Sequence, residues 1–487
     1  MITFFICLAL LIIGFFTYGK IVERTFHPDE RPTPCVEHPD GVDYVPMKPW
    51  RAFLIQLLNI AGLGPIFGAL SGAVWGPSVY LWIVFGTIFA GAVHDYLCGM
   101  LSERNNGASI SEIVGIYLGP VMKTVMRIFS VVLLVMVGVV FMVGPAGLLA
   151  LLTPSTLSVK FWTIVVLIYY FLATLLPIDK IIGKLYPIFG ICLIVMAIGI
   201  GGSTILHDGT RPMMELTFDN LRPDGAPVWP LMFITVACGA ISGFHATQSP
   251  MIARCMTSEK QGRNIFYGAM VTEGIIALIW ASAGIAFYYN PAHGMGALLD
   301  LGGGNSTVVY EMSMKLLGPV GGALAMIGVI ACPITSGDTA FRSARLTISD
   351  WFKIDQTDVK KRLALSAPLL VIGYFISLFD YQVIWRYFSW ANQTLAMLAL
   401  WAGAVYLCRF VSKNASFMAA IPATFMSAVS MTYILYAPEG LGLGASGHAN
   451  LAYGIGLAFA LLLAVVYMLR IYIPAAKNGA GLDQYTA

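Results

Sequence analysis

The sequence predicts an all-α polytopic membrane protein with about thirteen transmembrane helices and a core of two inverted repeats of five helices each. Composition is the first observation: 58% of the 487 residues are hydrophobic and only 11% are charged, whereas soluble proteins average about 25% charged residues. The second observation is a series of apolar runs of about 17 to 25 residues, long enough to cross a bilayer as helix. The third is a pair of interrupted runs, five spans apart, as expected of an inverted repeat.

The charges between the apolar runs orient the chain. If the 19–50 loop is cytoplasmic, that side of the membrane holds 23 of the 28 Lys and Arg residues. The positive-inside rule then places the N-terminus outside and the C-terminus inside a plasma (inner) membrane. The first run lacks the charged start and the cleavage site of a signal peptide, so we expect a retained helix. The predicted spans lie near residues 2–18, 51–76, 78–101, 126–152, 161–177, 184–203, 229–253, 264–289, 317–337, 364–381, 386–410, 415–436 and 450–472.

These spans predict five segments along the chain. Residues 1–50 form an extra helix and a cytoplasmic loop, and residues 51–203 form the first repeat. An extracellular loop at 204–228 leads to the second repeat at 229–410, and residues 411–487 add two helices and a short cytoplasmic tail.

The stretch "NIAGLGPIFG" interrupts the span at 51–76 near its midpoint. Gly62 and Gly64 relax the backbone, and Pro65 has no N–H to donate. Half-helices over 51–60 and 66–76 are therefore expected on either side. Unwound backbone at this depth is tolerated only where protein buries it or where it lines a cavity, so the break marks either a site or a packing kink.

A second interruption, "CGAISGFHATQSP", falls in the span at 229–253. Ser249 followed by Pro250 has the N-cap and first-turn chemistry of a new half-helix. His245 would then lie in unwound chain at membrane depth. Two broken spans that cross the membrane in opposite directions are typical of transporters with a midplane site.

Four stretches resemble the carbon starvation protein A family: "NIAGLGPIFGALSGAVWGP", "LWIVFGTIFAGAVHDYLCGMLSERNNGASISEIVG", "GFHATQSPMIARCM" and "PITSGDTAFRSARL". The similarity runs from about residue 48 to residue 395. It implies the 5+5 fold of the amino acid–polyamine–cation superfamily. It also implies either proton-coupled pyruvate transport or peptide uptake, without the longer C-terminal region of the larger members.

A small carboxylate needs an anion site, and the free N–H groups at a half-helix N-terminus provide one without arginine. The half-helix that starts near Gly64 is the candidate. The alternative for each lining residue is hydrogen bonding that merely satisfies a helix break, and for Asn392 it is a bond between helices. The candidate substrate-binding residues are Asn59, Gly62, Gly64, Gly243, Phe244, His245, Gln248, Ser249 and Asn392.

Ionisable side chains inside the spans are candidates for coupling or gating, because isolated charges in hydrocarbon are costly and usually pair. His245 is the foremost, since imidazole changes charge near neutral pH. Arg254 is expected to reach Asp95 or Asp338 as a cytoplasmic gate, with a static tether between helices as the alternative. The full set is His94, Asp95, His245, Arg254, Glu273 and Asp338.

The superfamily resemblance also implies a sodium alternative at Thr335 and Ser336, because sodium-coupled members use neighbouring hydroxyls at the matching helix. Hydroxyls bonded to the preceding helical turn are the competing interpretation. No other metal or cofactor is expected, since the eight cysteines lack metal-ligand spacing.

The sequence thus predicts proton-coupled import of a small carboxylate, most specifically pyruvate, with peptide or amino-acid uptake as the alternative. No Walker motif is present, so ATP is not the direct energy source. An intramembrane enzyme built on His94, Asp95 and His245 lacks an HExxH motif or a nucleophile elbow. A passive channel would not need two opposed broken helices. No basic patch suggests a nucleic-acid partner; the lipid bilayer and the substrate are the expected partners.

Overall fold

Helices make up the regular structure of the computed structural model. It describes residues 1–478 without 42, 176–177, 208, 237 and 355–357, and only the backbone at 175–187 and 476–478. Among these residues, nine helical segments are long and apolar enough to cross a membrane, and a bent pair makes a tenth. The all-α membrane class is confirmed, while the total of thirteen spans stays a prediction.

The first eleven helices, in chain order, cover the stretch from the N-terminus to the loop near residue 207. They are α1 (Ile2–Phe16), α2 (Tyr18–Phe26), α3 (Pro34–Glu37), α4 (Pro49–Ala61), α5 (Ala69–Ala73), α6 (Val79–Leu81), α7 (Ala92–Arg104), α8 (Ile110–Leu118), α9 (Pro120–Leu152), α10 (Val159–Leu175) and α11 (Ile178–Leu206).

Ten more helices follow that loop. They are α12 (Leu231–Thr235), α13 (Gly243–Ala253), α14 (Gly268–Tyr288), α15 (Gly296–Asp300), α16 (Ser306–Phe352), α17 (Val359–Ile376), α18 (Tyr381–Tyr406), α19 (Phe417–Tyr436), α20 (Ala449–Tyr467) and α21 (Ile473–Asn478). Short π-helical segments continue several of them, among them Gly64–Gly68, Trp82–Gly91 and Arg263–Tyr267.

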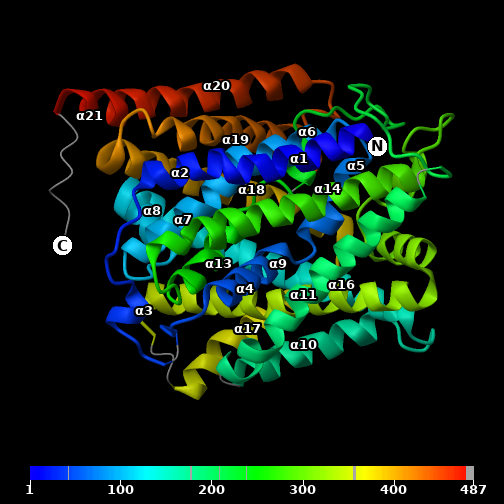
Figure 1. Ribbon diagram of the computed structural model, residues 1–487, viewed down its shortest axis with the longest axis horizontal. Coiled ribbons are helices and arrows are strands. Elements are labelled where there is room, and N and C mark those ends of the chain that lie inside the picture. Colours follow the sequence, from blue (N-terminus) through cyan, green and yellow to red (C-terminus); the bar gives the residue numbers. More distant parts are fainter. Residues whose placement is uncertain (42, 176–177, 208, 237, 355–357, 479–487) are drawn as a thin grey trace.

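The long helices run side by side, with the start of α1 at one end of the bundle and α21 at the other (Figure 1). The N-terminal end lies beside the loop after α11, where the backbone N–H of Ile2 donates to Glu215 Oε1 at 2.9 Å. The N-terminus and the 204–228 loop therefore share one face, as expected. That this face is the outer one stays a prediction.

Burial separates an inner set of helices from a lipid-facing set. In the most apolar window of Val79–Arg104 and of Tyr381–Val411, 83% of the residues are buried, against 22% for Ala449–Ala475. An apolar helix left this bare needs lipid around it. The inner set is therefore the place where polar side chains meet each other, and there the two interrupted spans lie.

The first interruption matches its prediction. Helix α4 ends at Ala61, a π-helical segment begins at Gly64, and the two parts meet at an angle of 52°. Gly62 has a φ of +32°, a conformation that side-chain-bearing residues rarely adopt. Glycine is thus required at the point where the backbone turns.

The second interruption differs from its prediction. Helix α12 ends at Thr235 and α13 begins at Gly243, so Ser249 and Pro250 lie inside α13 rather than at its start. Asn392 on α18 supplies the cap, because its Oδ1 accepts the backbone N–H of Phe244 at 2.7 Å. A tertiary hydrogen bond has replaced the local Ser-Pro signal, and His245 stands in the first turn of a helix instead of in unwound chain.

Candidate substrate and ion site

The two helix breaks touch each other at the centre of the protein. A Cβ atom added to Gly64 would lie 2.1 Å from Cys238 Cβ, in the unwound segment before α13. A Cβ on Gly62 would meet the ring of Phe141, which in turn stacks edge-on with Phe244. At both Gly62 and Gly64 the neighbouring side chains lie so close that only glycine fits. The unwound segments of the two breaks together form one buried junction.

Asn392 closes this junction from α18. Its Oδ1 accepts Ser242 Oγ at 3.0 Å as well as the N–H of Phe244, and its Nδ2 donates to Cys238 Sγ at 3.5 Å. Gly243 lets α18 come this near, since a Cβ there would lie 2.4 Å from the carbonyl of Asn392. Asn392 thus both caps α13 and links helices.

Asp95 on α7 is the centre of a buried charged group. Its Oδ1 lies 2.8 Å from Nδ1 of His94, and its Oδ2 lies 2.8 Å from Nδ1 of His245 on α13. None of the three side chains is exposed. A buried carboxylate needs donors to each oxygen, and the two imidazoles supply them.

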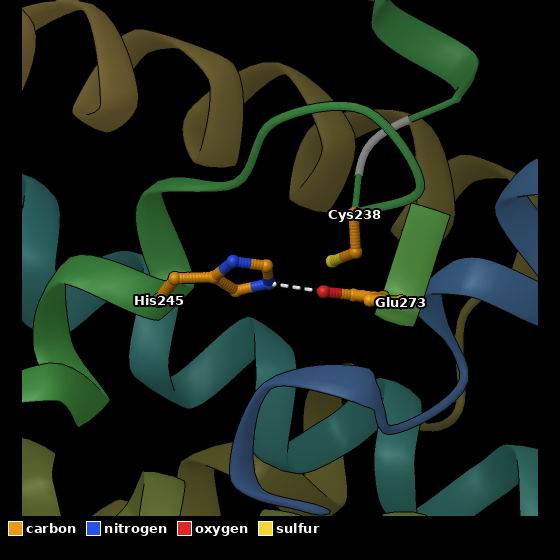
Figure 2. Close-up of side chains that lie close together, drawn as sticks. All are labelled: Cys238, His245 and Glu273. Carbon is orange, nitrogen blue, oxygen red and sulfur yellow. Dashed lines mark ion pairs between the residues drawn. The ribbon is translucent and has the colours of Figure 1, made fainter. Parts of the chain in front are cut away.

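His245 faces a second carboxylate on its other side (Figure 2). Its Nε2 lies 3.3 Å from Glu273 Oε2 on α14, and both side chains are fully buried. The contact does not have hydrogen-bond geometry, so Nε2 and both Glu273 oxygens have no hydrogen-bond partner. Two acceptors that face each other in a dry interior repel unless a proton or a metal ion lies between them.

Cys238 completes this group. In Figure 2 its sulfur points toward the line from His245 to Glu273, and one ligand atom from each of the three residues lies within 4.8 Å of the others. Cys238 was not among the predicted site residues. Its position seven residues before His245, in the same broken span, was the available signal.

The other predicted lining residues lie around the junction without converging on one point. Ser249 Oγ donates to the carbonyl of His245 at 2.9 Å and accepts Gln56 Nε2 at 3.3 Å. Gln248 Nε2 donates to Thr247 Oγ1. The side-chain oxygens of Asn59 and Gln248 are buried and have no hydrogen-bond partner, so these two residues retain free acceptors.

Arg254 pairs elsewhere than predicted. Its Nε donates to the carbonyl of Gly107 at 2.9 Å and its Nη1 lies 3.8 Å from Asp43, whereas Asp95 is occupied by the two histidines. Arg254 directly follows the end of α13 at Ala253, about two helical turns past His245. It lines a cavity of about 170 Å³ that reaches Thr247 on α13.

Asp338, the other predicted partner of Arg254, pairs within its own helix. Arg342 Nη2 lies 3.4 Å from Asp338 Oδ2, one turn further along α16. The structure therefore does not join Asp338 to the Asp95 group, and its predicted gating role stays a prediction.

Thr335 and Ser336 lie beside the first break. Ser336 Oγ donates to the carbonyl of Leu58 at 3.0 Å and to that of Cys332 at 3.1 Å. Thr335 Oγ1 bonds back to Cys332 at 2.7 Å. Ser336 therefore bonds to the preceding turn of its own helix and also contacts α4, and a sodium-binding role for Thr335 and Ser336 stays a prediction.

A helical membrane protein in which two broken helices meet in a sealed polar interior has the architecture of a transporter. Sequence comparison gives the family. The family model for the carbon starvation protein CstA matches residues 1–150, 149–290 and 292–433, and the chain belongs to this family. It is a multi-pass membrane transporter rather than an enzyme.

Two of the following relatives carry transporter names. The chain is 26% identical to the peptide transporter CstA of Bacillus subtilis over 84% of each chain. It is 27% identical to the pyruvate/proton symporter BtsT of Escherichia coli, over 62% of this chain and 52% of that protein. A membrane protein of Haemophilus influenzae is 44% identical over 60% of this chain and 92% of its own.

Among solved structures, the manganese transporter of Eremococcus coleocola is similar, with a TM-score of 0.58 and 12% identity. The match covers 89% of this chain and 99% of that one. At such low identity the likeness shows the fold alone, and it supports the transporter architecture.

Proposed function

We propose that this transporter imports a small carboxylate, with pyruvate as the foremost candidate, by proton symport across the inner membrane. The observation that carries the proposal is the contact between the two breaks, where Gly64 of the first meets Cys238 of the second. Substrate would bind at this junction, and the two halves would rock about it to expose it to each side in turn.

Helix termini at the junction support an anionic substrate. The segment that begins at Gly64 and the helix that begins at Gly243 both start there, and helix N-termini carry partial positive charge. The N–H of Phe244 donates to Asn392, so the other first-turn N–H groups are the candidate donors to an anion. Asn59 is buried on α4, within two turns of Gly64. This polar, uncharged lining suits one carboxylate and one keto group.

Peptide uptake is the alternative, and the name of the Bacillus relative favours it. A peptide brings an amino group that needs a counter-charge. Asp95 has both oxygens bonded to imidazoles and Asp338 is paired with Arg342, which leaves Glu273 for that role. Peptide uptake would therefore require Glu273 to face the substrate, whereas a carboxylate substrate requires no acidic counter-charge.

The name of the Escherichia coli relative supports the proton as coupling ion. Sodium is the alternative, with Ser336 Oγ and the carbonyl of Leu58 as its oxygen ligands.

The N-terminus would lie outside and the C-terminus in the cytoplasm, in keeping with the excess of Lys and Arg on that side.

The test is uptake of labelled pyruvate into sodium-free proteoliposomes with an imposed inward proton gradient. We expect concentrative uptake that a protonophore abolishes. Uptake that appears only with sodium would keep the substrate and change the ion. Absence of pyruvate uptake, together with uptake of a labelled dipeptide, would overturn the carboxylate assignment.

A further inference from the structure

We propose that Cys238, His245 and Glu273 form a binding site for a single transition-metal ion of the Zn²⁺ type. A sulfur, an imidazole nitrogen and a carboxylate oxygen, one from each residue, lie within 4.8 Å of one another in a fully buried space. Tetrahedral zinc sets its ligand atoms about 3.3 to 3.8 Å apart, and His245 Nε2 and Glu273 Oε2 already lie 3.3 Å apart.

Asp95 orients the imidazole of His245 so that Nε2 faces the proposed site. Asp95 Oδ2 lies 2.8 Å from His245 Nδ1, and a carboxylate can only accept at that contact, so Nδ1 carries the hydrogen. In the neutral imidazole, Nε2 then carries the lone pair, and this nitrogen lies 3.3 Å from Glu273 Oε2. Metal-binding histidines are characteristically oriented in this way by a carboxylate on the other nitrogen.

The acceptors around the site have no other partner. His245 Nε2, Glu273 Oε1 and Glu273 Oε2 are all buried and make no hydrogen bond. Unpaired buried acceptors are costly, and two of these atoms, His245 Nε2 and Glu273 Oε2, lie 3.3 Å apart. A cation between them would satisfy the imidazole and the carboxylate together.

The thiol also has suitable surroundings. Asn392 Nδ2 donates to Cys238 Sγ at 3.5 Å, and Ser242 Oγ lies 3.3 Å from the same sulfur. The thiolate is the form of cysteine that coordinates metal. Both of these neighbours are neutral polar groups, so in these contacts no cation competes with a metal ion for the sulfur.

The donor set selects among metals. Thiolate and imidazole favour Zn²⁺ and comparable ions such as Co²⁺, whereas Mg²⁺ and Mn²⁺ prefer oxygen ligands. With three protein ligands, the fourth position stays open to a small molecule, as in exchangeable zinc sites. Because all three ligands are buried, an ion would reach the site only when α13 and α14 separate. The entry of the ion, unlike the site itself, rests on the proposed alternating-access function.

Metal binding can be measured without transport. The purified full-length chain, stripped with a chelator, is titrated with Co²⁺ and with Zn²⁺. We expect one ion per chain and a thiolate-to-cobalt charge-transfer absorption that Zn²⁺ abolishes. Cys238→Ser should remove that absorption and weaken Zn²⁺ binding at least tenfold, and Asp95→Asn should weaken it by about 10- to 100-fold. Cys7→Ser, a buried cysteine on α1, is the matched control and should change neither.

A second measurement uses only the wild-type chain, so it tests the site even if the variants fail to fold. Zn²⁺ should protect Cys238 from alkylation, read by mass spectrometry of the peptide, while Mg²⁺ should not. Binding that survives Cys238→Ser, an absorption without thiolate character, or alkylation unaffected by Zn²⁺ would overturn the site. Zinc binding without pyruvate uptake would overturn only the assignment of pyruvate as substrate. Pyruvate uptake without zinc binding would overturn only the metal site.

Discussion

Asp95 and His245 are joined at 2.8 Å across two helices, and neither side chain has any exposed surface. The bond ties α7 to the first turn of the helix that follows the second break. Because Asp95 also holds His94, it fixes two imidazoles with one carboxylate. Asp95 therefore links α7 to α13, in addition to the bonds that α13 makes to α18 and α4 through Asn392 and Ser249.

Replacing Asp95 with asparagine should disrupt this group. The amide has the size of the carboxylate, but its nitrogen can only donate and would face an imidazole N–H. We expect the free energy of unfolding to fall by about 1 to 3 kcal/mol, because a buried donor loses its acceptor, and uptake to fall at least tenfold. Thermal unfolding in detergent and proteoliposome uptake measure the two effects.

Asp224→Asn is the control for Asp95→Asn. Asp224 is 46% exposed in the loop after α11 and pairs with Arg222, and exposed pairs contribute little. Its replacement should leave the melting temperature and uptake unchanged. Equal behaviour of the two variants would show that the Asp95 group has no special role.

The sequence predicted the membrane class, the first break and most of the polar residues of the interior. Composition and the length of the apolar runs determine the membrane class, and the Gly and Pro residues at 62–65 determine the first break. Both can be predicted because they are local properties of the sequence. His94, Asp95, His245 and Glu273 were recognised one by one, since buried ionisable groups are rare in membrane spans. That Asp95 meets His245, and that His245 meets Glu273, depends on how α7, α13 and α14 pack.

The start of α13 could not be predicted for the same reason. Ser249 and Pro250 are a sound local start signal, but the cap comes from Asn392, which is 148 residues from Phe244. Cys238 was not predicted as a site residue because cysteine is common as a buried apolar residue. Only its approach to Gly64 and His245 in space gives it chemical meaning.

Gly64→Ala tests the contact between the breaks. The new methyl would lie 2.1 Å from Cys238 Cβ, so the second break must shift. We expect pyruvate uptake and zinc affinity each to fall at least tenfold while the protein still assembles in the membrane. Gly202→Ala on α11 is the control, since no atom lies within 4 Å of its added Cβ, and helix propensity should make it neutral or about 0.5 to 1 kcal/mol stabilising. Normal uptake by the Gly64→Ala variant would show that transport does not require the close contact between the two breaks.

Ser336→Ala distinguishes the coupling ions. Loss of the hydroxyl removes the bond from α16 to the carbonyl of Leu58, at a cost of about 1 kcal/mol in unfolding free energy. With proton coupling, uptake should be independent of sodium in the wild type and in the variant alike. Sodium stimulation of the wild type that disappears in Ser336→Ala would place the coupling ion at this hydroxyl.

Asn392→Asp separates binding from packing at the junction. Aspartate keeps the acceptor for Phe244 N and Ser242 Oγ, and its charge suits a helix N-terminus, so the protein should fold. The charge would repel a carboxylate bound beside it by a few kcal/mol at protein-like dielectric. We therefore expect KM for pyruvate to rise at least tenfold with a smaller change in kcat. Asn305→Asp, at the cap of α16, should leave KM unchanged because aspartate caps equally well. An unchanged KM in Asn392→Asp would mean that Asn392 only holds the helices together and that the anion binds elsewhere.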